Sequence, residues 1–353
     1  MATGLLLAAT GGVAAAATPN TAAPHTPTVG LATVMAGTTA TTTASTPATS
    51  AAPAGPHAYI TNQGSHDVSV VELASRRVVA TVPVEQAPAG VVAVPARGEV
   101  FVANAAGNSV SVIDMRQQRV VARFAAGQGA VGLDASADGR RLFVVDWHGR
   151  QLLVHDTASR ERLASVPLGV APAGVAALAD GSQAWVAERD DDRVALVDVA
   201  LARVIARVPV GSHPFALLLD APRHRLYALN VQSDNLSVID TRRREVVATL
   251  RTGKAPYGAA LADAGRLLYV TNQHADSVSV FDAQTLQPLR TLQGFAYPEG
   301  IAAHADRVYV VNWMDDNLAV LDAASGQRLA TVDLGRNPRG FGAFIGAPSP
   351  SGP

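Results

Sequence analysis

The sequence contains no cysteine among its 353 residues. This absence excludes disulfide bonds, cysteine-ligated zinc or iron–sulfur sites, covalent c-type haem and a lipid-modified cysteine anchor. Charged residues make up only 16% of the chain and aromatic residues 5%, with a net charge of -1, so a strongly basic nucleic-acid-binding domain is disfavoured. Packing of the apolar residues, 48% of the chain, must therefore hold the fold together.

Charge is missing altogether from the N-terminal segment, because no Lys, Arg, Asp or Glu precedes Asp67. Residues 1–17 are apolar and end in small residues, as in a secretory signal or leader, and they are too short for a membrane span of about 20 residues. Because a basic start is lacking, either the true start lies upstream or the segment is only an alanine-rich leader. Residues 18–56, rich in Thr, Ala, Pro and Ser, are predicted to form a disordered spacer. We expect an exported protein, periplasmic or secreted, without a transmembrane span.

Residues 57–346 are built from an internal repeat. Tetrapeptides related to Tyr269-Val270-Thr271-Asn272 recur at intervals of 42, 42, 42, 42, 42 and 40 residues, beginning at Tyr59, Phe101, Phe143, Trp185, Tyr227, Tyr269 and Tyr309. An acidic residue recurs on the same spacing from Glu72 to Asp322, and a glycine, in most copies two residues after a proline, recurs from Gly90 to Gly340. The chain therefore holds seven copies of one structural unit.

Each copy contains four short β-type segments separated by turn-forming residues, for example 257–261, 267–271, 277–281 and 288–292. Four antiparallel strands in about 42 residues are typical of one β-propeller blade, and blades must stack around an axis because a lone sheet cannot bury both faces. The first copy lacks its innermost strand, whereas residues 339–345 follow the last copy. We therefore predict an all-β, seven-bladed β-propeller of four-stranded antiparallel blades over residues 57–346. The C-terminal strand completes its first blade, and residues 347–353 form a flexible tail.

The tetrapeptide at Tyr269 and the S-V-x-V-[IF]-D pattern at Ser109–Asp114 and Ser277–Asp282 resemble the YVTN-repeat β-propeller family, including YncE-like proteins. The resemblance covers residues 57–346. It implies an exported seven-bladed propeller that is usually non-enzymatic. Some members of that family are similar to single-stranded DNA binders, and related propellers carry d1-type haem.

Residues that recur in every blade are expected to build the scaffold, because a ligand rarely has sevenfold symmetry. The acidic row from Glu72 to Asp322 is predicted to accept hydrogen bonds in the turn after the third strand. A second row ends the second strands, where asparagine is expected to satisfy loop backbone groups: Asn62, Asn104, Asp146, Glu188, Asn230, Asn272 and Asn312. Asp146 and Glu188 break this row, so the alternatives there are a divalent cation site at the mouth of the axis or structural carboxylates.

The remaining variation falls in loops on the face opposite the chain termini. We predict that ligand-binding residues are among Trp147, His148, Arg150, Arg189, His213, Lys254, Tyr257, Tyr297, Trp313, Arg336 and Arg339. Aromatic rings interleaved with Arg can stack bases and hold the phosphates of single-stranded DNA. Acids on the same loops would repel phosphate: Asp190, Asp191, Asp192, Glu299, Asp315 and Asp316. A protein, peptide, glycan or small ligand is an alternative of equal weight, and the tryptophans can also simply cover neighbouring loops.

The sequence shows no motif for nucleophilic, nucleotide-dependent or metallopeptidase chemistry. We therefore predict a non-enzymatic, monomeric binding scaffold without a cofactor, which uses the loops of the face opposite the termini. Two alternatives stay open. One is single-stranded DNA binding through Trp147, Trp313 and the basic loops, and the other is a propeller enzyme that is metal-dependent and lactonase-like or bears haem.

Overall fold

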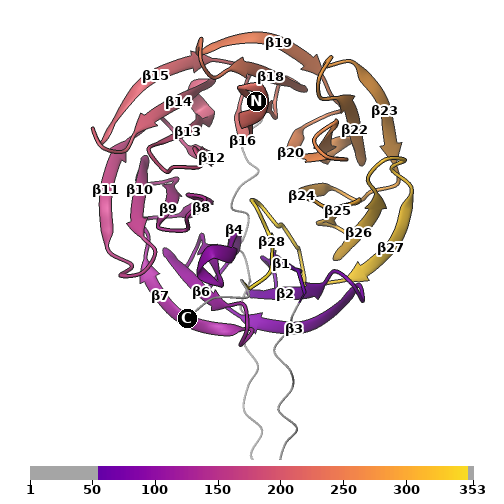
Figure 1. Cartoon of the computed structure of the whole chain (residues 1–353), viewed down its shortest axis with the longest axis horizontal. Coiled ribbons are helices and arrows are strands. Elements are labelled where there is room, and N and C mark those ends of the chain that lie inside the picture. Colours follow the sequence, from indigo (N-terminus) through magenta and orange to yellow (C-terminus); the bar gives the residue numbers. More distant parts are fainter. Residues whose placement is uncertain (1–54, 349–353) are drawn as a thin grey trace, which may run out of the picture. The chain divides into compact units, whose positions relative to one another are not determined.

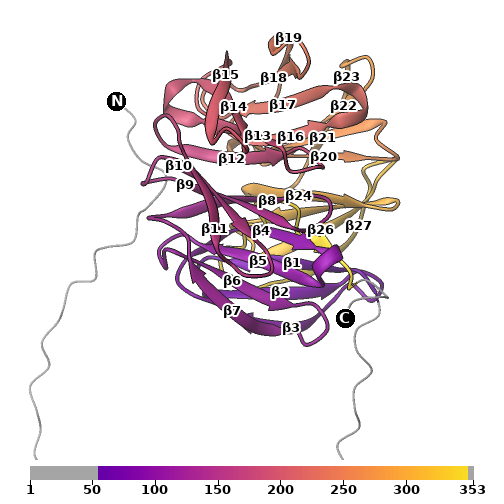
Figure 2. The same cartoon turned by 60° about the vertical axis from the view of Figure 1, so that its left-hand side comes forward.

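The computed structural model describes residues 55–348. Its strands form seven four-stranded antiparallel sheets around a central axis (Figure 1). Turned by 60°, the ring shows the sheets of successive blades packed against one another (Figure 2). The predicted all-β, seven-bladed propeller is therefore confirmed. The predicted leader, nearly all of the predicted spacer and most of the predicted tail lie outside the described residues.

Each blade begins with its innermost strand and ends with its outermost. Blades 1 to 4 are β28 (Ile345–Gly346), β1 (His57–Asn62), β2 (Asp67–Glu72) and β3 (Arg77–Pro83); β4 (Pro88–Val94), β5 (Glu99–Asn104), β6 (Ser109–Asp114) and β7 (Arg119–Ala125); β8 (Ala130–Ala135), β9 (Arg141–Asp146), β10 (Gln151–Asp156) and β11 (Arg162–Pro167); and β12 (Pro172–Ala177), β13 (Gln183–Glu188), β14 (Arg193–Asp198) and β15 (Arg203–Pro209).

Blades 5 to 7 are β16 (Pro214–Asp220), β17 (Arg225–Asn230), β18 (Asn235–Asp240) and β19 (Glu245–Arg251); β20 (Pro256–Ala262), β21 (Leu267–Asn272), β22 (Ser277–Asp282) and β23 (Pro288–Gln293); and β24 (Pro298–His304), β25 (Arg307–Asn312), β26 (Asn317–Asp322) and β27 (Arg328–Asp333). Short 3-10 turns are η1 (Pro95–Arg97), η2 (Arg189–Asp191), η3 (Ala221–Arg223) and η4 (Gln273–Ala275). Within residues 55–348, no helix is long and apolar enough to cross a membrane.

The ring closes where the C-terminal strap, residues 338–346, lies against β1. Ala58 pairs with Ile345 and His57 with Gly346, so regular pairing is limited to the two residues of β28. Further along, the Tyr59 amide donates to the Phe344 carbonyl at 2.8 Å, and the Arg339 amide donates to the Thr61 carbonyl at 2.8 Å. The prediction that a C-terminal strand completes the first blade is therefore confirmed.

The tetrapeptide of blade 6 connects this blade to blade 7. In blade 6, the Tyr269 hydroxyl donates to the carbonyl of Ala323 in blade 7 at 2.7 Å. The Thr271 hydroxyl accepts from the Gly258 amide at 2.8 Å and donates to the Glu299 carbonyl of blade 7 at 2.8 Å. Both side chains are buried, and a buried polar group stays stable only when it is hydrogen-bonded.

The acidic row behaves as the sequence predicts in six of its seven members. Asp282 accepts hydrogen bonds from the amides of Thr285 and Gln284, at 2.6 and 2.9 Å, in the turn after the third strand. These amides lower the pKa of Asp282, the Thr285 amide most strongly. Asp114, Asp156, Asp198, Asp240 and Asp322 make the same kind of bond to amides two or three residues ahead.

The recurring glycine lets the innermost strands of neighbouring blades approach closely. An added Cβ at Gly132 would overlap the carbonyl oxygen of Ala173, and one at Gly174 would overlap that of Phe215. At Gly258 the added Cβ would lie 2.6 Å from the Glu299 carbonyl oxygen. Because these contacts are with backbone atoms, the neighbouring blade cannot give way by turning a side chain. Blade 5 carries Ala216 at this position.

We predict that Gly132→Ala destabilises the ring by about 1–3 kcal/mol, the usual cost of forcing extra volume into a packed core. Urea denaturation followed by circular dichroism measures the effect. The matched control is Gly55→Ala, because nothing lies within 4 Å of a Cβ added there. Equal stability of the two variants would contradict the close-approach argument.

Candidate functional site

The loops opposite the chain termini form the upper face of the ring. They connect second to third strands (63–66, 105–108, 147–150, 189–192, 231–234, 273–276 and 313–316) or lead into the innermost strands (84–87, 126–129, 168–171, 210–213, 252–255, 294–297 and 334–337). The strands of the ring begin at His57 and end at Gly346, both on the other, lower face, together with the turns between first and second strands.

A β-bulge shapes the start of each complete innermost strand. Pro214 pairs with Asn230 but Leu217 pairs with Ala228, so β16 has one residue more than β17 at this point. The same shift occurs in β4, β8, β12, β20 and β24. A bulge re-aims the side chain it contains. The bulged residue lies between the recurring proline and glycine, and we call it the axial residue of each blade.

The axial residues divide the ring into two unequal halves. Blades 2, 3 and 4 carry Ala89, Val131 and Ala173, whereas blades 5, 6, 7 and 1 carry Phe215, Tyr257, Glu299 and Arg339. The surrounding proline and glycine hardly vary, so the axial residue is the variable element of an otherwise constant triplet. Large aromatic and charged side chains therefore lie together on one side of the mouth of the axis.

Aromatic rings close the axis. The ring centroids of Phe215 and Phe341 are 5.0 Å apart, those of Phe215 and Tyr257 4.6 Å, and those of Tyr257 and Phe341 6.2 Å. Phe341 belongs to the strap of blade 1, which is no neighbour of blade 5, so these rings must meet at the centre. All three are at most 9% exposed. We call Phe215, Tyr257 and Phe341 the axial plug.

A buried polar network surrounds the plug. Arg339 donates to the Tyr257 hydroxyl at 3.2 Å and to Gln63 Oε1 at 3.0 Å, and its Nε lies 3.6 Å from Glu299 Oε2. Gln273 donates to Glu299 Oε1 at 2.8 Å, whereas Oε2 has no hydrogen-bond donor. Burial raises the pKa of Glu299 to about 7, although the Arg339 charge and the Gln273 bond act in the opposite direction.

Two clusters of upper-face aromatic residues flank the mouth. Trp147 reaches toward Phe215, with 6.4 Å between ring centroids, and the Arg189 guanidinium lies over its ring at 5.7 Å. On the other side, Tyr297 lies 5.4 Å from His274 and 5.4 Å from Trp313 between ring centroids. The predicted ligand residues Trp147, Arg189, Tyr257, Tyr297, Trp313 and Arg339 are thus gathered at and around one mouth.

The other predicted ligand residues lie on the rim. His148, Arg150, Lys254 and Arg336 are exposed, and Arg150 and Arg336 donate to the carbonyls of Gly169 and Gly64. His213 Nε2 lies 3.6 Å from Asp190 Oδ1, and its buried Nδ1 has no hydrogen-bond partner. Tyr257 differs from expectation because it lies inside β20 and is 5% exposed.

The row at the ends of the second strands works differently from the prediction. Asparagine Nδ2 donates to side chains on the third strand, as from Asn272 to Ser277 and Ser279 at 3.1 and 2.9 Å. The side-chain oxygen accepts from a loop amide in Asn272 and Asn312, whereas the buried Oδ1 atoms of Asn62, Asn104 and Asn230 have no hydrogen-bond partner. The bond common to all five asparagines is therefore the one to the third strand, and only Asn272 and Asn312 also bind a loop amide.

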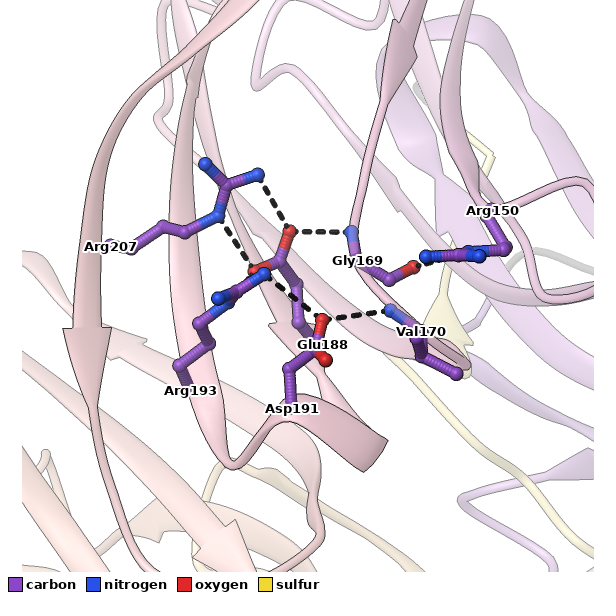
Figure 3. Close-up of polar contacts among 7 residues, drawn as sticks. All are labelled: Arg150, Gly169, Val170, Glu188, Asp191, Arg193 and Arg207. Atoms are coloured by element: carbon purple, nitrogen blue, oxygen red, sulfur yellow. Dashed lines mark hydrogen bonds and ion pairs between the residues drawn. The ribbon is translucent and has the colours of Figure 1, made fainter.

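The two carboxylates in this row keep the hydrogen bond between the second and third strands, but they accept it where asparagine donates it. Asp146 accepts from the side chain of Gln151 at 2.9 Å, where other blades present an acceptor. Glu188 accepts from Arg193 and Arg207 and from the Gly169 amide at 2.7 Å (Figure 3). Although burial alone would raise the pKa of Glu188, the arginine bonds hold it below its usual value.

These contacts account for both carboxylates as parts of the scaffold. Among residues 55–348, no three His, Asp or Glu side chains are arranged to hold a metal ion. The divalent cation site at Asp146 and Glu188 stays a prediction.

Charge on the upper loops is predominantly acidic. The fourteen loops contain four basic residues, Arg150, Arg189, Lys254 and Arg336, and eight acidic ones, Glu85, Asp190, Asp191, Asp192, Asp234, Asp276, Asp315 and Asp316. Two pockets of about 390 and 270 Å³ open instead on the lower face, beside Arg223 and beside His304. The upper face is therefore an acidic, aromatic surface over a closed axis.

Phe215, Phe341, Gln63 and Gln273 are absent from the ligand residues predicted from the sequence, and Glu299 is predicted only as a loop acid. The sequence did hold a signal for some of these residues, namely the recurring proline and glycine two residues apart. The residue between them is the one variable position of the triplet, and in four blades it is Phe215, Tyr257, Glu299 or Arg339. Phe341 and the two glutamines carry no such signal, because nothing in the repeat places them near the axis.

Closed four-stranded blades, a plugged axis and a variable upper face define this chain as a seven-bladed β-propeller. The family model described as a YNCE-like β-propeller matches residues 40–183, so the predicted resemblance to YncE-like propellers is confirmed. A second family model, the cytochrome D1 heme domain, matches residues 181–311. Comparison with curated proteins found no significant match.

Solved structures share the fold at low sequence identity. A functionally unknown protein from Desulfotomaculum acetoxidans DSM 771 is 14% identical with a TM-score of 0.70, covering 84% of this chain and 99% of that one. Kuenenia stuttgartiensis hydrazine synthase is 17% identical with a TM-score of 0.63, covering 71% and 87%. Dihydro-heme d1 dehydrogenase NirN, in complex with DHE, is 15% identical with a TM-score of 0.63, covering 80% and 74%. These likenesses show the fold alone.

We predict that Glu299→Gln changes the pH dependence of stability. Because the pKa of Glu299 is raised to about 7 in the fold from an ordinary 4.5, its contribution is complete below pH 4.5 and is lost as the pH rises through 7. The wild type should therefore lose about 2–3 kcal/mol relative to Glu299→Gln between about pH 5 and pH 8.

Urea denaturation of both proteins at a series of pH values measures this difference. Burial lowers the pKa of His57 and His155, so these residues contribute the opposite slope, but they do so equally in both proteins and cancel. A difference in unfolding free energy that stays constant across this pH range would contradict the prediction.

Proposed function

We propose that this protein is a non-enzymatic, exported binding scaffold whose ligand-binding surface is the upper face. The proposal rests on one observation: within the repeat, the constant positions build the scaffold and the variable positions lie at the mouth of the axis. Recurring acidic residues accept hydrogen bonds in turns, and recurring glycines let neighbouring blades approach each other closely. The variable axial and loop residues instead converge from blades 1, 3, 5, 6 and 7 on one mouth. Convergence of variable, chemically diverse side chains on one surface is the pattern that a binding site requires.

Export to the periplasm or outside the cell is part of the same proposal and is supported by the uncharged, leader-like N-terminus. The ring begins and ends on its lower face. A tether through the N-terminal segment would therefore leave the upper face directed toward a partner.

We predict that binders of this protein depend on Trp147 and Trp313. Peptides selected from a random phage-displayed library on the wild type, with an oligosaccharide panel screened alongside, should bind the Trp147→Ala/Trp313→Ala variant at least tenfold more weakly, because aromatic anchors dominate most interfaces. Calorimetry measures the affinities, and thermal denaturation checks that the variant folds.

The matched control is Leu201→Ala/Leu289→Ala, which removes exposed apolar side chains, 56% and 50% accessible, from the lower side of the ring. Binders should retain their affinity for this variant. Binders that lose affinity for the lower-face variant and keep it for the upper-face variant would refute the proposal, as would a failure of both screens to yield any binder.

A haem-bearing propeller is a second candidate, because the cytochrome D1 heme domain model matches residues 181–311. The residues at the mouth of the axis do not fit such a group. The axial plug and the Arg339–Glu299 pair fill the space where side chains from several blades meet. Of the upper-face histidines, His213 faces Asp190 and His274 Nε2 lies 3.3 Å from the Tyr297 hydroxyl.

We therefore predict that the purified protein shows no haem absorption band and that titration with haemin produces no saturable Soret shift. Absorption spectroscopy measures both. A stoichiometric shift that disappears in His213→Ala but not in His304→Ala, on the lower face, would establish a haem site and refute this prediction.

Single-stranded DNA binding has less support than binding of a polypeptide or glycan. A nucleic-acid surface gains most of its affinity from cations that neutralise phosphates. Acids outnumber cations by eight to four on the upper loops, and one of the four cations, Arg189, is paired with Asp190.

A further inference from the structure

We propose that the aromatic cluster of blades 6 and 7, formed by His274, Tyr297, Trp313 and the neighbouring Met314, receives an arginine or lysine side chain of a cationic polypeptide partner. The inference rests on the proposed binding function of the upper face and names the chemical class of its partner.

The first argument comes from two equivalent tryptophans. Trp147 and Trp313 each follow the last residue of a second strand, in blades 3 and 7. Trp147 already has a cation: Arg189 lies over its ring at 5.7 Å and forms an ion pair with Asp190. On the upper loops, Trp147, Arg189 and Asp190 thus form one complete arrangement of an indole, a guanidinium and a carboxylate.

Trp313 has the indole and the carboxylates without the cation. Asp315 and Asp316 follow it two and three residues later, and among residues 55–348 no arginine or lysine lies over its ring or pairs with either acid. A cation over an indole face gains about 0.5–2 kcal/mol. An incoming guanidinium would therefore complete at Trp313 the arrangement that Arg189 completes at Trp147.

The charge distribution supports the same sign of partner. Among the described residues, five of the eight upper-loop acids lack an ion-pair partner: Asp192, Asp234, Asp276, Asp315 and Asp316. Asp276 and Asp316 accept loop amides, from Tyr297 at 2.9 Å and from Asn337 at 2.7 Å, so their positions are fixed by the scaffold. Asp315 is exposed and makes no side-chain hydrogen bond. Such a surface attracts cations and repels phosphate.

Glu299 adds an independent, buried feature at the edge of the cluster. The residue is 1% exposed, and its Oε2 has no hydrogen-bond donor. Gln273, the residue before His274 of the cluster, donates to Glu299 Oε1 at 2.8 Å. Burial raises the pKa of both Tyr257 and Tyr297, and the Glu299 charge acts in the same direction. Trp313 Nε1 is also buried without a partner.

A polypeptide is favoured over a small organic cation because the surface is open. Met314 is 63% exposed beside the cluster, and two pockets of the structure lie on the other face. A single ammonium ion would bury little surface here. A peptide can place a cationic side chain over Trp313, an apolar one against Met314 and its backbone along the loops, and several contacts together give useful affinity.

The test is a calorimetric titration of the full chain with a capped peptide of alternating arginine and glycine, at low and at high ionic strength. Its glutamate counterpart and oligo(dT) serve as anionic probes. We expect saturable binding of the arginine peptide that weakens with salt, and none of either anionic probe. Asp315→Asn should weaken binding about threefold, and Trp313→Ala about tenfold.

Two controls separate the site from general charge attraction and from misfolding. Asp306→Asn removes the same charge from the same blade on the lower face, where Asp306 is 75% exposed, and it should leave the affinity unchanged. Trp313→Phe keeps an aromatic face and should bind better than Trp313→Ala.

Absence of arginine-peptide binding, equal loss in Asp315→Asn and Asp306→Asn, or tighter binding of oligo(dT) would each overturn the inference. If library peptides or oligosaccharides still require Trp147 and Trp313 in that event, the proposed binding function stands and only the cationic partner fails. If no probe of any class depends on the upper face, both fail.

Discussion

The close approach of the seven innermost strands is the constraint on which the rest of the structure depends. Six of the seven innermost strands begin with a bulge, and in blades 2, 3, 4, 6 and 7 the glycine of the bulge lies against the backbone of the next blade. Without a side chain at that point the strands can converge to a narrow axis. The bulge directs the axial residue, which precedes the glycine, toward the centre of the ring. The same bulge therefore allows the ring to close and places the side chains of its mouth.

Closure at such a narrow axis makes a few side chains sufficient to fill it. Phe215, Tyr257 and Phe341 meet there, although Phe341 comes from the strap that completes blade 1. The strap therefore has two roles, because it supplies both the innermost strand of the first blade and two residues of the mouth, Arg339 and Phe341. Ring closure and the chemistry of the upper face are coupled through this segment.

The carboxylates of blades 3 and 4 show how the scaffold absorbs a change that resembles a functional signal. Where the row has asparagine, the third strand presents serine, asparagine or aspartate as an acceptor; where it has Asp146 or Glu188, the third strand presents Gln151 or Arg193 as a donor. The hydrogen bond is kept and only its polarity is reversed. A broken row is therefore weak evidence for a site unless the residues facing it fail to compensate.

The sequence by itself determined the number of blades, the four strands in each, the completion of the first blade by the C-terminus and the acidic turns. All of these follow from a local period that repeats seven times. It also located the upper face and most of its rim. Only the tertiary structure decided which residues meet: Phe215 and Phe341 lie 5.0 Å apart across the ring, and Arg339 reaches Tyr257 and Gln63 in different blades. Such contacts cross the axis between blades distant in sequence, and their geometry depends on the curvature of the whole ring, which no single repeat encodes.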